Sequence, residues 1–121
     1  MPVRAIRGAI TVAGNSREAI LEGTTVLLQA LVEANGLQAG EVIAATFTAT
    51  ADLDQAYPAE AARSLGWTQA GLLCLQEMGV EGALDLCIRV QVLWETDRPQ
   101  SAIQHCYLRG AAALRRDLQG E

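Results

Sequence analysis

The chain has 121 residues, half of them apolar, and a net charge of −5. This length allows one domain, over residues 1–121, with a substantial core and no room for a second. The acidic balance argues against nucleic acid or an anionic membrane as the partner, because those ligands select broad basic surfaces. No signal-peptide pattern and no apolar run of roughly 20 residues is present, so we expect a cytoplasmic protein.

The cysteine pattern argues against both a disulfide framework and a zinc site. Cys74, Cys87 and Cys106 are odd in number, have no C-x-x-C spacing, and share the chain with a single histidine, His105. Reduced thiols in a cytosolic protein are the better interpretation.

The first predicted element is a strand over residues 3–13. Alternation places Arg7 on one face among small residues, with Ile6 and Ile10 on the other. Gly8 would let another backbone or a ligand approach this strand closely. Arg7 is therefore a charge in the middle of a strand.

A helix follows from about residue 16 to residue 35. The segment Gly14-Asn15-Ser16 is expected to end the strand and cap this helix, with Glu18, three residues after Asn15, as a capping-box partner. Apolar residues from Ile20 to Leu31 recur at helical spacing and predict the buried stripe. The opposite side carries only solvated carboxylates, so we interpret this helix as scaffold.

The remaining predicted elements are a helical turn near 37–41, a strand over 42–50, a helix from Pro58 to about Leu65, a strand over 67–75, a short helix over 79–83, a strand over 86–94 and a strand over 104–108. On the second helix, Arg63 is expected to pair with Glu60. The order β-α-β-α-β-β-β predicts a mixed α/β (α+β) fold, with helices on one face of a five-stranded mixed sheet. The uncovered face needs burial, and self-association would supply it.

Arg89 is the most informative single residue. In the strand over 86–94 the even-numbered residues form the apolar face, and Arg89 lies on the other. A guanidinium in such a strand needs water, a carboxylate or a bound anion, because an unpaired buried charge is costly. Glu77 could supply the carboxylate that pairs with Arg89 within the chain. Arg7 lies in a similar setting, which favours an anionic ligand, and the residues alone leave both explanations open.

Familiar catalytic motifs are absent from the sequence. It lacks G-x-S-x-G, H-E-x-x-H and the phosphate-binding G-x-x-x-x-G-K, and a lone histidine is more often structural than a general base. What remains is Glu77, Cys74, Tyr107 and a set of arginines at positions 7, 63, 89, 115 and 116. This set suits holding a polyanion in a fixed pose better than nucleophilic or metal chemistry.

Six segments resemble the monofunctional chorismate mutases of the Bacillus type: Arg4–Ala9, Ala49–Arg63, Cys74–Met78, Cys87–Val90, His105–Leu108 and Leu114–Leu118. The segments are dispersed, and the resemblance extends over nearly the whole chain. The resemblance implies a homotrimer whose mixed sheets pack around a three-fold axis as a pseudo-barrel, with active sites in clefts between subunits. It also implies conversion of chorismate to prephenate, on the route to phenylalanine and tyrosine, without metal or organic cofactor.

The resemblance also implies the site residues. Those matched to substrate binding are Arg7, Tyr57, Arg63, Leu73, Cys74, Leu75, Gln76, Glu77, Arg89, Tyr107 and Arg115. Of these, Arg89, Glu77 and Arg7 are expected to take part in catalysis, with Arg89 as the cation beside the reacting ether oxygen. The sequence departs from some relatives at Glu60, where they carry lysine, and at Leu73, where a threonine is known.

Two other functions are alternatives to chorismate mutase activity. A Rid-type imine deaminase resembles the family in trimeric architecture and also uses a cleft arginine, but the segment from Cys74 to Glu77 and the Leu114–Leu118 segment are not expected there. The other is a non-catalytic trimer that binds a small carboxylate.

Overall fold

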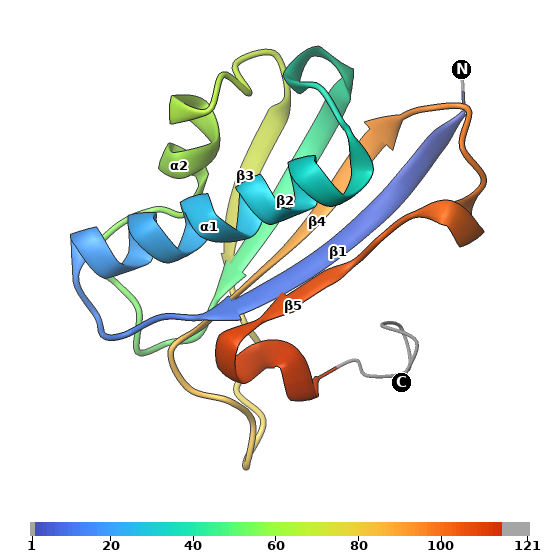
Figure 1. Ribbon diagram of the computed structural model, residues 1–121. Helices are drawn as coiled ribbons and strands as arrows, with labels where there is room; N and C mark the ends of the chain where they lie inside the picture. The colour runs from blue at the N-terminus through green and yellow to red at the C-terminus, as the bar shows by residue number, and fades with distance from the viewer. Residues whose placement is uncertain (1, 115–121) are drawn as a thin grey trace.

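The computed structural model describes residues 2–114 and has a five-stranded mixed sheet with α-helices on one face (Figure 1). The strands are β1 (Val3–Thr11), β2 (Val42–Ala49), β3 (Gly71–Gln76), β4 (Cys87–Glu95) and β5 (Cys106–Leu108). The α-helices are α1 (Arg17–Asn35) and α2 (Ala59–Ser64), and short 3-10 turns cover Ala39–Glu41, Gln100–Ala102 and Arg109–Ala113. The predicted fold class and element order are confirmed.

The strand order in the sheet is β3-β2-β4-β1-β5. Strand β4 is central and pairs antiparallel with both β1 and β2, whereas the edge strands β3 and β5 run parallel to their neighbours. Arg89 of β4 lies opposite Ala9 on β1 and Thr48 on β2. The arginine singled out from the sequence is thus in the middle of the sheet.

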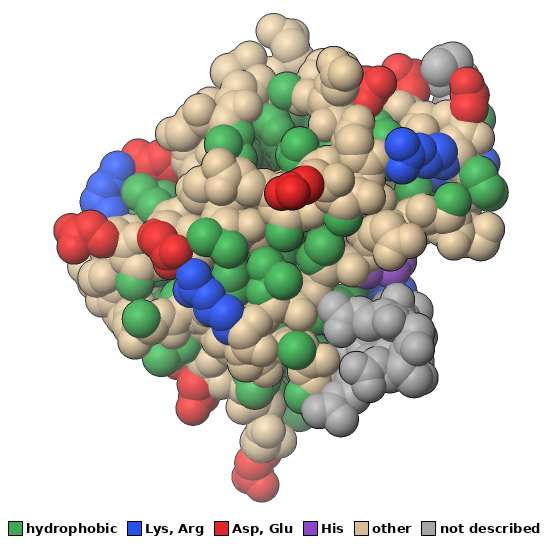
Figure 2. Space-filling view, viewed as in Figure 1, with side chains coloured by type: hydrophobic (Ala, Val, Ile, Leu, Met, Phe, Trp, Pro, Cys, Tyr) green, Lys and Arg blue, Asp and Glu red, His purple; other side chains and the backbone are tan. Residues whose placement is uncertain are grey.

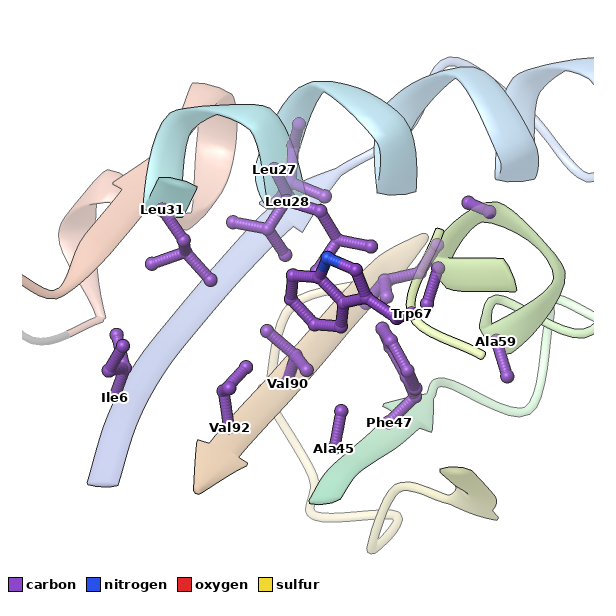
Figure 3. Packing of buried hydrophobic residues seen from close by; sticks show 14 of the residues in the cluster. Ile6, Leu27, Leu28, Leu31, Ala45, Phe47, Ala59, Trp67, Val90 and Val92 are labelled. Carbon is purple, nitrogen blue, oxygen red and sulfur yellow. The ribbon is translucent and has the colours of Figure 1, made fainter. Parts of the chain in front are cut away.

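The core lies between the helices and one face of the sheet. Figure 3 shows Trp67 and Phe47 packed beneath α1, beside Leu28 and Val90. All four side chains are 3% exposed or less. The predicted apolar stripe of α1 and the even-numbered face of β4 meet in this cluster, and burial of such side chains stabilises the fold by roughly 1.5–3 kcal/mol each.

At the start of α1, the structure differs from the prediction in the residue that caps the helix and in the partner of Asn15. The cap is Ser16, whose hydroxyl accepts a hydrogen bond from the Ala19 N–H at 3.1 Å, so the predicted Asn15–Glu18 capping box is wrong. The Asn15 amide is engaged elsewhere: it donates to an Asp54 carboxylate oxygen at 2.9 Å and accepts from the Asp54 N–H at 3.0 Å. Asn15 therefore joins the β1–α1 turn to the loop after β2.

The third strand begins at Gly71, later than predicted. Trp67 instead closes the end of α2: its N–H donates to Ala62 O, and the Gly66 N–H donates to Arg63 O. Gly66 adopts a φ of 92°, the left-handed conformation of this helix ending. The indole of Trp67 then turns into the core, so an apolar residue that resembled a strand position is a helix terminator.

Two further predictions are corrected. The segment between β3 and β4 is a loop rather than a helix over 79–83, with one turn closed by the Ala83 N–H donating to Val80 O. Gly82, with a φ of 83°, does not fit a helix. The last strand covers only Cys106–Leu108, because the backbone of Gln104 bonds to the Asn35 side chain instead of a strand.

The two faces of the sheet differ in cover. On the helix-covered face, acidic and basic side chains are interspersed, with no broad basic surface (Figure 2). The other face carries no α-helix in the described part of the chain; a small buried cluster there joins Ala9, Cys87 and Tyr107 to Ala111 of the 3-10 turn Arg109–Ala113. Leu73 and Leu75 of β3 are about half exposed. No helix within residues 2–114 is long and apolar enough to cross a membrane.

Candidate active site

The two mid-strand arginines lie on the same face of the sheet, opposite the helices. Arg7 pairs with Gln91 across the β1–β4 ladder, and Arg89 pairs with Ala9. Arg7 and Arg89 are therefore diagonal neighbours on that face. Strand alternation alone produces this arrangement, because the two positions share the side opposite Ile6 and Ile88.

Glu77 directly follows the edge strand β3. Its N–H donates to Ala49 O at 2.9 Å, which extends the β2–β3 ladder by one residue. One carboxylate oxygen, Oε1, accepts a hydrogen bond from the Thr48 hydroxyl at 2.6 Å and lies 3.3 Å from Arg89 Nε. The prediction that Glu77 pairs with Arg89 within the chain is confirmed.

The contact between Glu77 and Arg89 is ionic but poorly directed. Arg89 Nε is buried and has no hydrogen bond of good geometry to any described residue, although it lies 3.3 Å from the carboxylate. The side chain as a whole is 39% exposed. Arg89 is thus held on one side by a carboxylate, and its outer part is accessible to a ligand.

These residues line a hollow of about 290 Å³. Its lining comprises Arg7, Gly8, Thr46, Thr48, Glu77, Arg89, Val90, Gln91 and Tyr107. Two guanidinium groups face one carboxylate, which leaves one net positive charge in a chain whose net charge is −5. The hollow therefore favours an anionic ligand.

Tyr107 reaches the hollow from the edge strand β5. It lies opposite Ala9 of β1, is 6% exposed, and packs with Cys87 and Ala111. This packing restricts the ring, so the residue presents a fixed edge to the hollow. Burial raises the pKa of the Cys87 thiol, and the same cause raises that of Cys106, so neither is an activated nucleophile.

The other predicted site residues surround a second cavity, of about 620 Å³, at the carboxyl ends of β2 and β3. Those that line it are Tyr57, Arg63, Cys74, Leu75 and Gln76. Leu73 lines neither space and is exposed on the helix-free face. Arg115 lies outside the described residues. Within one chain, the structure thus divides the predicted site into two groups.

A third cavity, of about 540 Å³, lies between the two groups. It shares Glu77 and Arg89 with the first hollow, and Thr50 and Ala51 with the second cavity. Asp52 and Cys87 also line it, and the rest of its wall comes from the β3–β4 loop, which Figure 1 shows extending beyond the end of the sheet. The two groups of candidate residues are therefore adjacent along one edge of the molecule.

Sequence reasoning missed Thr48, which bonds Glu77, and Arg17. Thr48 could have been found, because alternation along β2 places it on the face of Arg89. Glu60 pairs with Arg17 rather than with Arg63 as predicted: the Arg17 guanidinium donates to both carboxylate oxygens, at 2.7 and 2.8 Å. No spacing rule connects residues 43 positions apart.

Comparisons with known proteins show the family of the chain. Residues 3–118 match the family described as chorismate mutase type I. Chorismate mutase AroH of Thermus thermophilus is 51% identical over 118 residues, covering 97% of both chains. Chorismate mutase AroH of Bacillus subtilis (strain 168) is 43% identical over 119 residues, covering 98% of this chain and 94% of its own.

The fold agrees as well. A solved chorismate mutase from Clostridium thermocellum superposes with a TM-score of 0.89 at 46% identity, covering 91% of this chain and 98% of its own. Family, sequence relatives and fold all match over nearly the full chain, and they confirm the resemblance stated from the sequence. The chain belongs to the type I chorismate mutases.

Proposed function

We propose that this chorismate mutase converts chorismate to prephenate in phenylalanine and tyrosine biosynthesis, in clefts between the subunits of a homotrimer. The observation that carries the proposal is the hollow that Arg7, Arg89 and Glu77 line together, because its net positive charge and its two arginines at diagonal positions fit a compact dianion. The reaction breaks one C–O bond and forms one C–C bond in a single concerted step. It requires no proton transfer and no nucleophile.

Arg89 has the decisive role in this mechanism. Negative charge builds on the ether oxygen as the C–O bond breaks, so a cation beside that oxygen stabilises the transition state more than the ground state. Arg89 is suited to it because Glu77, itself held by the Thr48 hydroxyl, contacts Nε and leaves the outer nitrogens toward the hollow. The cation is therefore oriented before the substrate binds.

The other residues hold the substrate in its compact conformer. Arg7 and Tyr107, on the neighbouring strands β1 and β5 that line the same hollow, bind carboxylate oxygens. Glu77 orients Arg89 and accepts a hydrogen bond from the substrate hydroxyl. Fixing the two reacting carbons close together removes much of the entropic cost of the rearrangement.

The division of the site into two groups supports a cleft shared between subunits. We assign the hollow to one subunit and the facing wall to its neighbour, through the group around the second cavity: Tyr57, Arg63, Cys74, Leu75 and Gln76. Leu73 and Arg115 are proposed as substrate-binding residues from the family resemblance alone. Leu73 and Leu75 are 55% and 50% exposed on the face that lacks helices, as expected for residues that a neighbouring subunit covers.

Two measurements test the proposal. Purified protein mixed with chorismate should form prephenate, and light scattering should give about three times 12.9 kDa. Binding of chorismate without turnover would leave only a carboxylate-binding protein. A monodisperse monomer with full activity would remove the shared cleft.

We also propose a cytoplasmic location and a single domain over residues 1–121. The odd number of cysteines supports a reducing compartment, and the single sheet supports one folding unit. Cell fractionation and limited proteolysis, respectively, test these two statements.

A further inference from the structure

A bidentate ion pair lies on the wall of the second cavity. Arg17, at the first position of α1, donates through both terminal nitrogens to both oxygens of Glu60, in the first turn of α2. Both residues line the cavity. The Arg17 side chain is 58% exposed and that of Glu60 36%, so the pair is accessible to solvent and adds little to stability.

Glu60 has a second cation within reach. Arg63 follows it by three residues on α2, a spacing at which helical side chains of opposite charge pair. Yet the side chain of Arg63, which lines the same cavity, makes no ion pair or hydrogen bond to any residue in the 2–114 range. Both oxygens of Glu60 are already occupied by the fork of Arg17.

The other charged side chains around this cavity are paired with one another or with polar neighbours. The charged side chains that line it are Arg17, Asp54, Glu60 and Arg63. Asp54 is bonded to Asn15 and to Gln55, which hold its pKa below the usual range. The pKa of Glu60 is lowered chiefly by the hydrogen bonds from Arg17, and the charge of Arg63 is the smallest contribution. Among the described lining residues, Arg63 is the cation without a committed partner.

We propose that Arg17 is a positioning residue for substrate binding: by holding both oxygens of Glu60, it keeps Arg63 available to the carboxylates of the substrate. The inference rests on the proposed function, which supplies the dianionic ligand. Without Arg17, Glu60 would present a free negative charge on the cavity wall and would also turn to Arg63. Both changes weaken binding of a dianion, and neither touches the reacting bonds near Arg89.

The test is a double-mutant cycle with Arg17→Gln and Glu60→Gln. Arg17→Gln should raise KM for chorismate about five- to tenfold with kcat within about twofold, as expected for loss of an electrostatic attraction remote from the reacting bonds. Glu60→Gln in the same chain should bring KM back to within about twofold of wild type, because a neutral amide neither repels the dianion nor captures Arg63. The rise in KM should shrink between about 20 mM and about 0.5 M salt.

A matched control separates this role from a change in net charge. Arg109→Gln breaks a comparable exposed pair, between Arg109 and Glu22, which is not on the cavity wall, and should leave KM unchanged. An unaltered KM in Arg17→Gln, or a double variant as impaired as the single one, would overturn the inference while wild-type turnover upheld the function. Absence of wild-type turnover would overturn the function, and the inference with it.

Discussion

Replacing Arg89 with citrulline separates transition-state stabilisation from substrate binding. Citrulline keeps the planar shape and the Nε–H of arginine and removes the charge. In the structure this leaves the packing against β1 and β2 intact, and it leaves Glu77 without its cation 3.3 Å away. The hollow then loses its net positive charge, because one guanidinium faces one carboxylate.

The expected magnitude follows from the exposure of Arg89. Its side chain is 39% exposed, so an effective dielectric constant of about 20 applies, and two unit charges about 4 Å apart interact by about 4 kcal/mol. Loss of a single oxyanion donor costs about 3–4 kcal/mol. At about 1.4 kcal/mol for each tenfold change, kcat should fall about 10³-fold. KM should rise by about tenfold, because the dianion meets a neutral hollow.

The assay is steady-state turnover of chorismate by variants shown to be folded and of the same size as the wild type. Adding Glu77→Gln to the citrulline variant restores one net positive charge and keeps an oxygen that can accept from Thr48. KM should then recover, and kcat should stay low. Arg98→citrulline, which removes the same charge beyond the far end of β4 beside Trp94, should change neither constant by more than about twofold.

One kinetic result would contradict the proposed role of Arg89. If the Arg89→citrulline variant keeps kcat within a few-fold of wild type while KM rises, Arg89 only anchors a carboxylate. The electrostatic account of catalysis would then be wrong, and Arg7 would become the residue to test.

Three other predictions concern stability, thiol chemistry and metals. Asn35→Ala should lower the free energy of unfolding by about 3 kcal/mol in urea, roughly 1 for each of three hydrogen bonds that this buried side chain makes with Leu31 and Gln104. Replacing exposed Gln29 with Ala should change it by less than about 0.5 kcal/mol, and a loss below about 1 kcal/mol in Asn35→Ala would contradict the expectation. Because burial raises the pKa of Cys87 and favours the neutral thiol, iodoacetamide at pH 8 should leave it unmodified in the native protein and modify it in urea, as read by mass spectrometry; rapid native labelling would show that the site opens. Exhaustive chelation and dialysis should leave turnover unchanged, since a pericyclic step needs no metal; activity lost and then restored by a divalent ion would refute the mechanism.

Much of the fold followed from local patterns. Alternation over residues 86–94 correctly separated Arg89 from the buried face, and helical spacing correctly identified the stripe of α1. These predictions succeed because the periods of strand and helix are properties of neighbouring residues. The same alternation placed Arg7 on the outer face of β1, and the pairing of β1 with β4 then brought it diagonal to Arg89.

Predictions failed where a residue's partner comes from elsewhere in the chain. Trp67 is a residue type that is common in strands, but here its backbone closes α2. Its indole fills the core beneath α1. Glu60 was assigned its helical neighbour Arg63 and instead binds Arg17, which the α1–α2 contact brings beside it. Tertiary packing overrides local propensity at such positions.

The chemical character of the site, with arginines within strands and a carboxylate at Glu77, can be seen in the amino-acid sequence alone. Which of these residues meet depends on the fold. Arg7, Glu77, Arg89 and Tyr107 share one hollow because β1, β4 and β5 are neighbours and β3 ends beside Thr48. The group around Arg63 surrounds another cavity. The physical reason is that alternation assigns a side chain to a face, whereas strand order and register, which depend on contacts distant in sequence, decide its neighbours.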